Sequence, residues 1–190
     1  MQCLIDKFVD NFLKDEGENN EEELEIYKYG LLVGSEFFVF LFCFLIICLF
    51  NRMLAEGIIF LTIFMLIRSY TGGLHLDRYR DCLILSCSVL VLVLMAIKYL
   101  SVPIYILFSA AVVLSVITLK LGKGNKEADS EQEESFFYHK TKVNLAGIML
   151  VAIIFCFADY VNGMAAITYT MVCIVISLYC GKMKKKLENE

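Results

Sequence analysis

Most of this 190-residue chain consists of long apolar blocks separated by short charged stretches. A helix satisfies its own backbone polar groups, and about 20 apolar residues in helical form span the hydrocarbon layer of a bilayer. The blocks, 15 to 21 residues long, are 30–50, 53–67, 83–97, 102–121, 143–158 and 161–180. The sequence therefore predicts an all-α integral membrane protein with about six transmembrane helices.

The composition leaves little room for a separate soluble domain. The chain is 59% hydrophobic, whereas a soluble domain is about 45–50% apolar, and the mean hydropathy is +0.69. The net charge of −4 excludes the basic footprint of a nucleic-acid-binding protein. We expect a single membrane domain over residues 1–190, with an N-terminal part (1–29), a membrane region (30–181) and a charged tail (182–190).

The first fourteen residues have the pattern of an amphipathic helix that lies at a membrane interface. Charged residues interrupt this segment too often for the apolar core of a signal peptide. The acidic run 15–25 that follows is predicted to be a solvated linker. The apolar stripe of the amphipathic segment consists of Met1, Leu4, Ile5, Phe8, Val9, Phe12 and Leu13.

The basic residues predict an orientation for the six helices. If both termini lie in the cytoplasm, every lysine and arginine except Arg52 and Lys98 falls in a cytoplasmic segment. Such an asymmetry follows the positive-inside rule. The sequence thus predicts an N-in, C-in topology, with the loop 68–82 on the cytoplasmic side.

The second and third blocks are short for membrane spans. Each has 15 residues, which corresponds to about 22 Å of helix against a hydrocarbon thickness of about 30 Å. Either polar neighbours extend these helices, or the two are partly re-entrant around the loop that joins them. Short spans also gain contact area by packing, so a homodimer is compatible with the sequence.

The loop 68–82 concentrates reactive side chains. It contains one of the two histidines, His75, and a cysteine outside the apolar blocks, Cys82. A catalytic thiol needs a base or positive charge nearby to form the thiolate, and Arg68, Arg78 and Arg80 provide positive charge. Cys82 is also predicted in the first turn of a helix, where the helix dipole favours an anion.

Two geometric features constrain this candidate site. Gly72 and Gly73 are predicted to break the helix that ends at Ile67, because glycine adopts positive φ. His75 and Cys82 lie seven residues apart, about 10.5 Å along one straight helix, which is too far for a hydrogen bond. We therefore expect His75 to precede the helix that carries Cys82, and Asp77 to be a candidate for orienting His75.

Other readings of these residues remain open. Metal binding is not expected, because two distant histidines and one thiol make no zinc signature, and no cofactor is predicted. Glu36 and Glu56 lie inside apolar blocks, where carboxylates are costly and often functional. Together with Asp159 they are compatible with a transporter of a small peptide. A non-catalytic membrane scaffold is a third interpretation. The cysteines of the apolar blocks are interpreted as small hydrophobic residues; they are Cys43, Cys48, Cys87, Cys156, Cys173 and Cys180.

The pattern Arg68-x-x-x-Gly72-Gly73-x-His75 followed by Cys82 resembles the accessory gene regulator protein B family of membrane peptidases, which process precursors of quorum-sensing peptides. The resemblance extends over essentially the whole chain. The loop 121–142 departs from the family pattern, because it lacks proline and contains the acidic run 127–134. This departure bears on recognition of the precursor more than on catalysis.

The resemblance implies a cysteine endopeptidase with His75 as the base and Cys82 as the nucleophile. Arg68 and Gly73 match positions that the family needs for activity. The implied reaction cleaves the precursor through an acyl-thioester on Cys82, from which a thiolactone or lactone ring closes. The implied partners are an amphipathic precursor peptide and membrane lipids, with Arg78, Arg80 and Glu36 as candidates for substrate binding.

Overall fold

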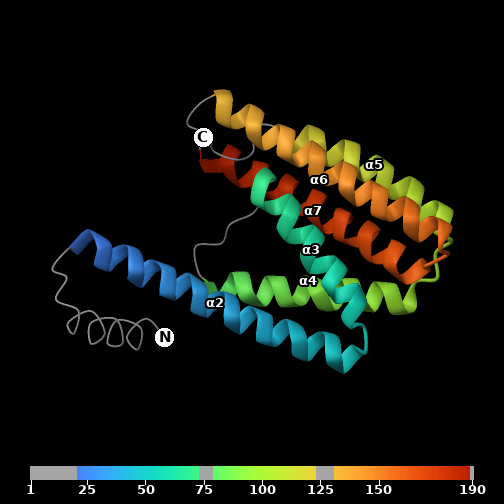
Figure 1. The fold of residues 1–190 in the computed structure, drawn as a ribbon, viewed down its shortest axis with the longest axis horizontal. Helices are drawn as coiled ribbons and strands as arrows, with labels where there is room; N and C mark the ends of the chain where they lie inside the picture. Colours follow the sequence, from blue (N-terminus) through green and yellow to red (C-terminus); the bar gives the residue numbers. More distant parts are fainter. Residues whose placement is uncertain (1–20, 73–78, 123–130, 189–190) are drawn as a thin grey trace. The chain divides into compact units, whose positions relative to one another are not determined.

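The computed structural model describes residues 21–72, 79–122 and 131–188. Within these residues all regular structure is helical, and six helices are present (Figure 1). They are α2 (Glu21–Asn51), α3 (Leu54–Thr71), α4 (Tyr79–Tyr99), α5 (Ile104–Gly122), α6 (Glu131–Phe157) and α7 (Val161–Glu188). Each helix covers one of the six apolar blocks to within two residues at its ends. The predicted amphipathic helix over residues 1–14 lies outside the described residues.

The chain divides into two compact units, with the boundary between Ile46 and Ile47. In the first unit α2 is helical from Glu21, so residues 21–25 of the predicted linker belong to a helix. Glutamate is a good helix former, and negative charge in the first turn interacts favourably with the helix dipole. The side chain of Glu36, within α2, is not described.

The second unit is built around α7, which contacts α3, α4, α5 and α6. The N-terminal half of α7 is buried on nearly all sides, since Met164, Ala165, Ala166, Ile167, Thr168, Thr170 and Met171 are all buried. A helix that is buried all around belongs at the centre of a bundle. The hydroxyl of Thr168 donates a hydrogen bond to the carbonyl oxygen of Leu107 at 3.0 Å and so joins α7 to α5.

The helices on both sides of the candidate loop are longer than the apolar blocks within them. α3 continues past Ile67 to Thr71, and α4 begins at Tyr79, four residues before its apolar block. With 18 and 21 residues, they are about 27 and 31 Å long. Polar residues therefore extend both helices beyond their apolar blocks, and the placement of these residues within the membrane stays a prediction.

Two more helix ends differ from the prediction. α6 begins at Glu131, so residues 131–142 are helical rather than part of a loop. α7 continues to Glu188, so most of the charged tail is also helical. Hydropathy marks only the apolar part of a helix, whereas glutamate and lysine continue it because their helix propensity is high.

Four stretches in the described part of the chain are long and apolar enough to cross a membrane. They are Leu54–Thr71, Ile104–Gly122, Gln132–Phe157 and Val161–Lys184. The apolar stretches Phe37–Asn51 in α2 and Leu83–Tyr99 in α4 are shorter. The chain is thus a helical membrane protein, and the number of six crossings stays a prediction.

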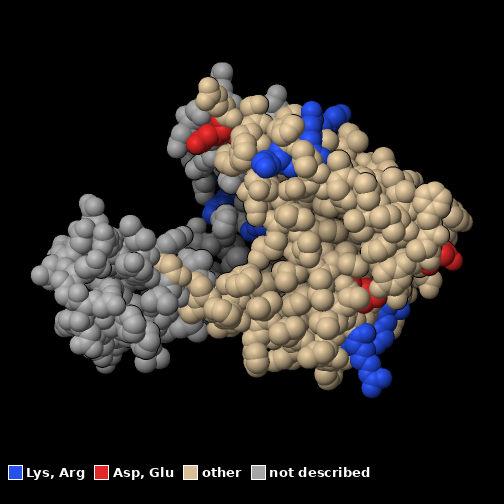
Figure 2. Space-filling model, viewed as in Figure 1, with Lys and Arg blue, Asp and Glu red and all other residues tan. Residues whose placement is uncertain are grey.

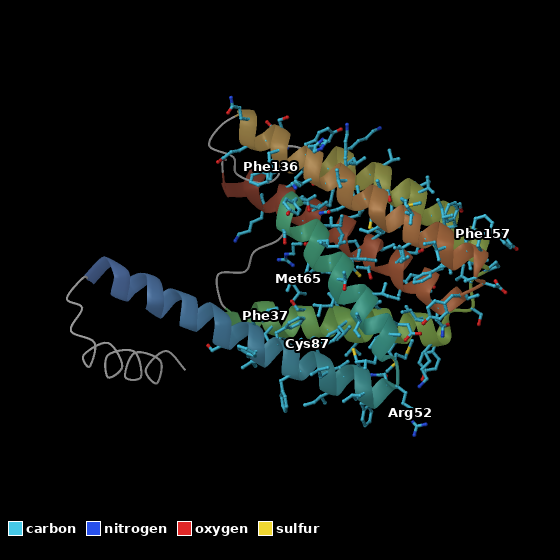
Figure 3. All side chains as sticks on the ribbon, viewed as in Figure 1. Phe37, Arg52, Met65, Cys87, Phe136 and Phe157 are labelled. Atoms are coloured by element: carbon cyan, nitrogen blue, oxygen red, sulfur yellow. The ribbon has the colours of Figure 1, made fainter. Side chains whose placement is uncertain are left out.

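The outer surface of the helices is apolar. Phe136 and Phe157, near the two ends of α6, are 53% and 90% exposed, and Met65 on α3 is 40% exposed (Figure 3). Large exposed apolar side chains on this scale suit a lipid environment. The cysteines of the apolar blocks are all thiols in the described part of the chain, consistent with their interpretation as small hydrophobic residues.

The second unit has two differently charged ends. The C-terminal ends of α3, α5 and α7 and the N-terminal ends of α4 and α6 lie together, at what we call the Gly72 end (Figure 1). The opposite end, which we call the Arg52 end, contains Arg52 and Lys98 together with Glu56 and Asp159. On the face shown in Figure 2, the surface between the two ends carries few charged groups. The described basic residues toward the Gly72 end are Arg68, Lys120, Lys140, Lys142, Lys182, Lys184 and Lys186.

Candidate functional site

The last turn of α3 leads directly into the candidate site. The hydroxyls of Ser69 and Thr71 donate to the carbonyl oxygens four residues earlier, at 2.7 and 2.9 Å. Gly72 caps the helix with φ 71° and ψ −150°, and its N–H donates to the carbonyl oxygen of Arg68 at 3.1 Å. This backbone conformation is essentially restricted to glycine. The predicted glycine break is therefore present, but at Gly72 rather than directly after Ile67.

Arg68 lies on the helix and not in the loop where it was predicted. Its guanidinium is 5.3 Å from the centre of the Phe64 ring, a distance at which a cation is attracted to an aromatic face. A cation in the last turn also interacts favourably with the negative end of the helix dipole. Both interactions explain why the helix continues through Arg68, and both keep a positive charge close to Gly72.

Cys82 lies in the first turn of α4, as predicted. The helix begins at Tyr79, after His75 in the chain, and Cys82 is its fourth residue. The first four N–H groups of a helix have no partner within it, and their dipoles stabilise a nearby anion. Arg80 belongs to the same turn. The side chains of Arg80 and Cys82, and all of Gly73, His75, Asp77 and Arg78, lie outside the described residues.

Two contacts that the sequence did not predict fix the end of α3 from its neighbours. A Cβ atom built on Gly122, the last residue of α5, would lie 2.9 Å from Cγ2 of the buried Thr71. The side-chain amide of Asn144 on α6 donates to the carbonyl oxygen of Leu66 at 3.2 Å. A polar residue near the start of an apolar block was the available signal for Asn144, whereas no signal identified Gly122.

At the Arg52 end, Glu56 has a structural partner. Glu56 is 7% exposed, and its carboxylate accepts a hydrogen bond of 2.9 Å from the hydroxyl of Tyr160, between α6 and α7. Burial, together with this bond, raises the pKa of Tyr160. The Tyr160 ring packs edge-on against Phe155 at 5.2 Å, and a Cβ atom on Gly163 would overlap it.

The positions of the acidic residues bear on the transporter alternative. Glu56 is in the first turn of α3, and the exposed Asp159 lies in the turn between α6 and α7. Both residues are thus at helix ends, whereas transporters bind their substrates near the middle of the membrane. The bond to Tyr160 gives the burial of Glu56 a structural explanation.

Replacing Tyr160 with phenylalanine is expected to lower the free energy of unfolding by about 1–3 kcal/mol, because the buried carboxylate of Glu56 then loses its donor. The midpoint of thermal unfolding in detergent micelles measures this loss. Tyr105→Phe is the matched control, since Tyr105 is 69% exposed. Equal midpoints for the two variants would contradict a stabilising role for the Glu56–Tyr160 bond.

Comparison with known proteins identifies the family of the chain. A family profile described as accessory gene regulator B matches residues 3–179. The chain belongs to the accessory gene regulator B family. The match to this family includes every residue from Arg68 to Cys82 and confirms the resemblance drawn from the sequence. No curated protein and no solved structure matched the chain.

Membership in the accessory gene regulator B family gives the helical bundle a biological role. The family is associated with the processing of peptides for quorum sensing. The apolar helices agree with a membrane location for such a protein. In this accessory gene regulator B chain, α3 ends at Thr71 and α4 begins at Tyr79, on either side of the connection in which the sequence predicts the site.

Proposed function

We propose that the chain is a membrane cysteine endopeptidase that cleaves the precursor of an autoinducing peptide and retains the N-terminal part as an acyl-thioester on Cys82. The observation that carries this proposal is the position of Cys82 in the first turn of α4, in a chain of the accessory gene regulator B family. His75, earlier in the same connection, is the proposed base.

The proposed reaction has two steps. His75 takes the proton of Cys82, the thiolate attacks a peptide carbonyl carbon, and the peptide C–N bond breaks as His75 returns the proton to the leaving amine. A thiol or hydroxyl within the retained precursor segment then attacks the thioester carbonyl carbon as His75 takes its proton. Cys82 leaves as thiolate, and a thiolactone or lactone ring is closed.

The helix framework supports formation of the thiolate. The unpaired N–H groups of the first turn of α4 and the positive end of its dipole stabilise an anion at Cys82. Thiolate formation is the step that limits the reactivity of a cysteine with an ordinary pKa of about 8.5. Backbone N–H groups beside Gly72 are candidates for stabilising the oxyanion.

We further propose that the Gly72 end faces the cytoplasm. Seven of the described basic residues lie toward this end, whereas Arg52 and Lys98 mark the opposite one. This distribution agrees with the positive-inside rule for an N-in, C-in chain. In this orientation the site meets a precursor on the inner leaflet, where Arg78 and Arg80 attract acidic residues of the peptide.

The acyl-thioester is the direct test. The purified protein in detergent is mixed with a synthetic precursor peptide, quenched in acid and analysed by intact-mass and peptide-mass measurement. We expect an adduct with the mass of the N-terminal precursor fragment, located on Cys82 and removed by neutral hydroxylamine. Cleavage of the precursor with no adduct, or with the adduct on another cysteine, would overturn the proposed mechanism.

A further inference from the structure

The closest approach between α3 and α5 lies directly before the candidate site. A Cβ atom on Gly122 would be 2.9 Å from Cγ2 and 3.4 Å from Cβ of Thr71. Real Cβ atoms do not occur at the shorter of these distances without a shift of the neighbour. The absence of a side chain at Gly122 is therefore what allows the last turn of α3 to lie where it does.

Thr71 has little freedom to move away. Its side chain is 1% exposed, and its hydroxyl donates to the carbonyl oxygen of Ile67 at 2.9 Å. The next residue is Gly72, in a conformation that only glycine adopts without strain. A displacement of Thr71 would therefore move the point from which the chain leaves α3 toward His75.

A second contact, from α6, holds the preceding turn of α3. The amide of Asn144 on α6 bonds to the carbonyl oxygen of Leu66 at 3.2 Å. The last two turns of α3 are thus fixed by α5 through packing and by α6 through a hydrogen bond. The remaining part of the connection to α4 is short, because only residues 73–78 separate Gly72 from Tyr79.

We propose that Gly122 is a positioning residue for the peptidase reaction: its missing side chain allows Thr71 to seat the end of α3, and so sets where the segment with His75 starts relative to Cys82. This inference rests on the proposed function. It assigns a role in the reaction to a residue of the α5 terminus, 40 residues after Cys82 in the sequence.

Gly122→Ala is the first test. Gly122 does not have a positive φ, so alanine causes no backbone strain there and raises helix propensity. We expect kcat for precursor cleavage to fall about tenfold with little change in KM, because displaced catalytic groups cost rate rather than binding. The control is Gly147→Ala on α6, where an added Cβ meets nothing within 4 Å and cleavage stays at the wild-type rate.

A compensating substitution separates positioning from general damage. Thr71→Ser removes Cγ2 and keeps the hydroxyl, so the nearest contact of an alanine at position 122 becomes the ordinary 3.4 Å to Cβ. The double variant with Gly122→Ala is expected to recover the kcat of Thr71→Ser alone. A double variant that stays as slow as Gly122→Ala would overturn the role of this contact.

Cross-linking tests the contact without relying on activity. The Cβ separation of 3.4 Å is close to the mean of about 3.8 Å in disulfides. Thr71→Cys combined with Gly122→Cys, in a Cys82→Ala background, should therefore form a disulfide on mild oxidation, detected by peptide mass. Ser69→Cys combined with Gly122→Cys should not form a disulfide, because Ser69 and Thr71 lie on nearly opposite faces of α3.

The outcomes distinguish this inference from the proposed function. If wild type and Cys82→Ala cleave the precursor equally, the proposed function fails and the positioning role fails with it. If wild type cleaves and Cys82→Ala does not, but Gly122→Ala retains the wild-type kcat, the positioning role alone is wrong. Failure of the 71–122 disulfide to form would overturn the contact itself.

Discussion

Replacing Cys82 with alanine will reduce cleavage of the precursor to the background of cells without the protein, a loss of at least about a thousandfold. The reason is that alanine cannot form the acyl-thioester, so the proposed base His75 has no nucleophile to activate. His75→Ala should give a loss of similar order, because a base and its nucleophile act as one unit. The measurement is the ratio of intact to cleaved precursor after co-expression.

The matched control for this loss is Cys87→Ala. Cys87 lies on the same helix as Cys82 but within the apolar stretch Leu83–Tyr99. Its replacement removes a thiol from α4 without touching the first turn, so cleavage should remain. Undiminished cleavage by both Cys82→Ala and His75→Ala would contradict the peptidase proposal, and equal losses from Cys82→Ala and Cys87→Ala would point to damage of the helix instead.

Replacing Gly72 with alanine is expected to have the second-largest effect. The φ of 71° and ψ of −150° at Gly72 lie in a region where a side chain costs about 1–3 kcal/mol. The chain relieves this strain by leaving α3 in another direction, and the segment that carries His75 then starts from the wrong place. Misplacement of about 1 Å can reduce a rate a hundredfold, and we expect a loss of this order in kcat.

The measurement for Gly72→Ala combines kinetics with folding. The amount of protein in the membrane and its thermal midpoint in detergent show whether the bundle remains intact. Gly147→Ala serves as the comparison, because that glycine lies within α6 and has no positive φ. A wild-type kcat for Gly72→Ala would show that the exit of the chain from α3 does not set the geometry of the site.

The six helices in the described part of the chain could be predicted, because hydropathy directly indicates apolar helices. Each apolar block became the core of one helix, and the glycine pair before His75 correctly indicated a helix end. The positions of the ends could not be read in the same way. Residues 21–25, 131–142 and 182–188 are polar yet helical, since charged side chains with high helix propensity extend a helix beyond its apolar part.

The contacts between helices were beyond prediction for a different reason. Tyr160 bonds to Glu56 across 104 residues of sequence, and Asn144 to Leu66 across 78. The sequence shows that a polar side chain lies within an apolar block, but it does not show which distant residue forms a hydrogen bond with that side chain. For the candidate site, the sequence indicated the family, which the family match confirms, and it predicted the reactive residues. The contact between Thr71 and Gly122 could be found only from the structure.

The central position of α7 also affects how the protein is made. α7 is the last of the described helices to leave the ribosome, yet α3, α4, α5 and α6 all pack against it. The earlier helices therefore enter the membrane before the partner they share has been synthesised. Their own backbone hydrogen bonds keep them stable in lipid during this interval, and assembly of the bundle, with the α3 terminus in its final seat, is completed only after α7 has been inserted.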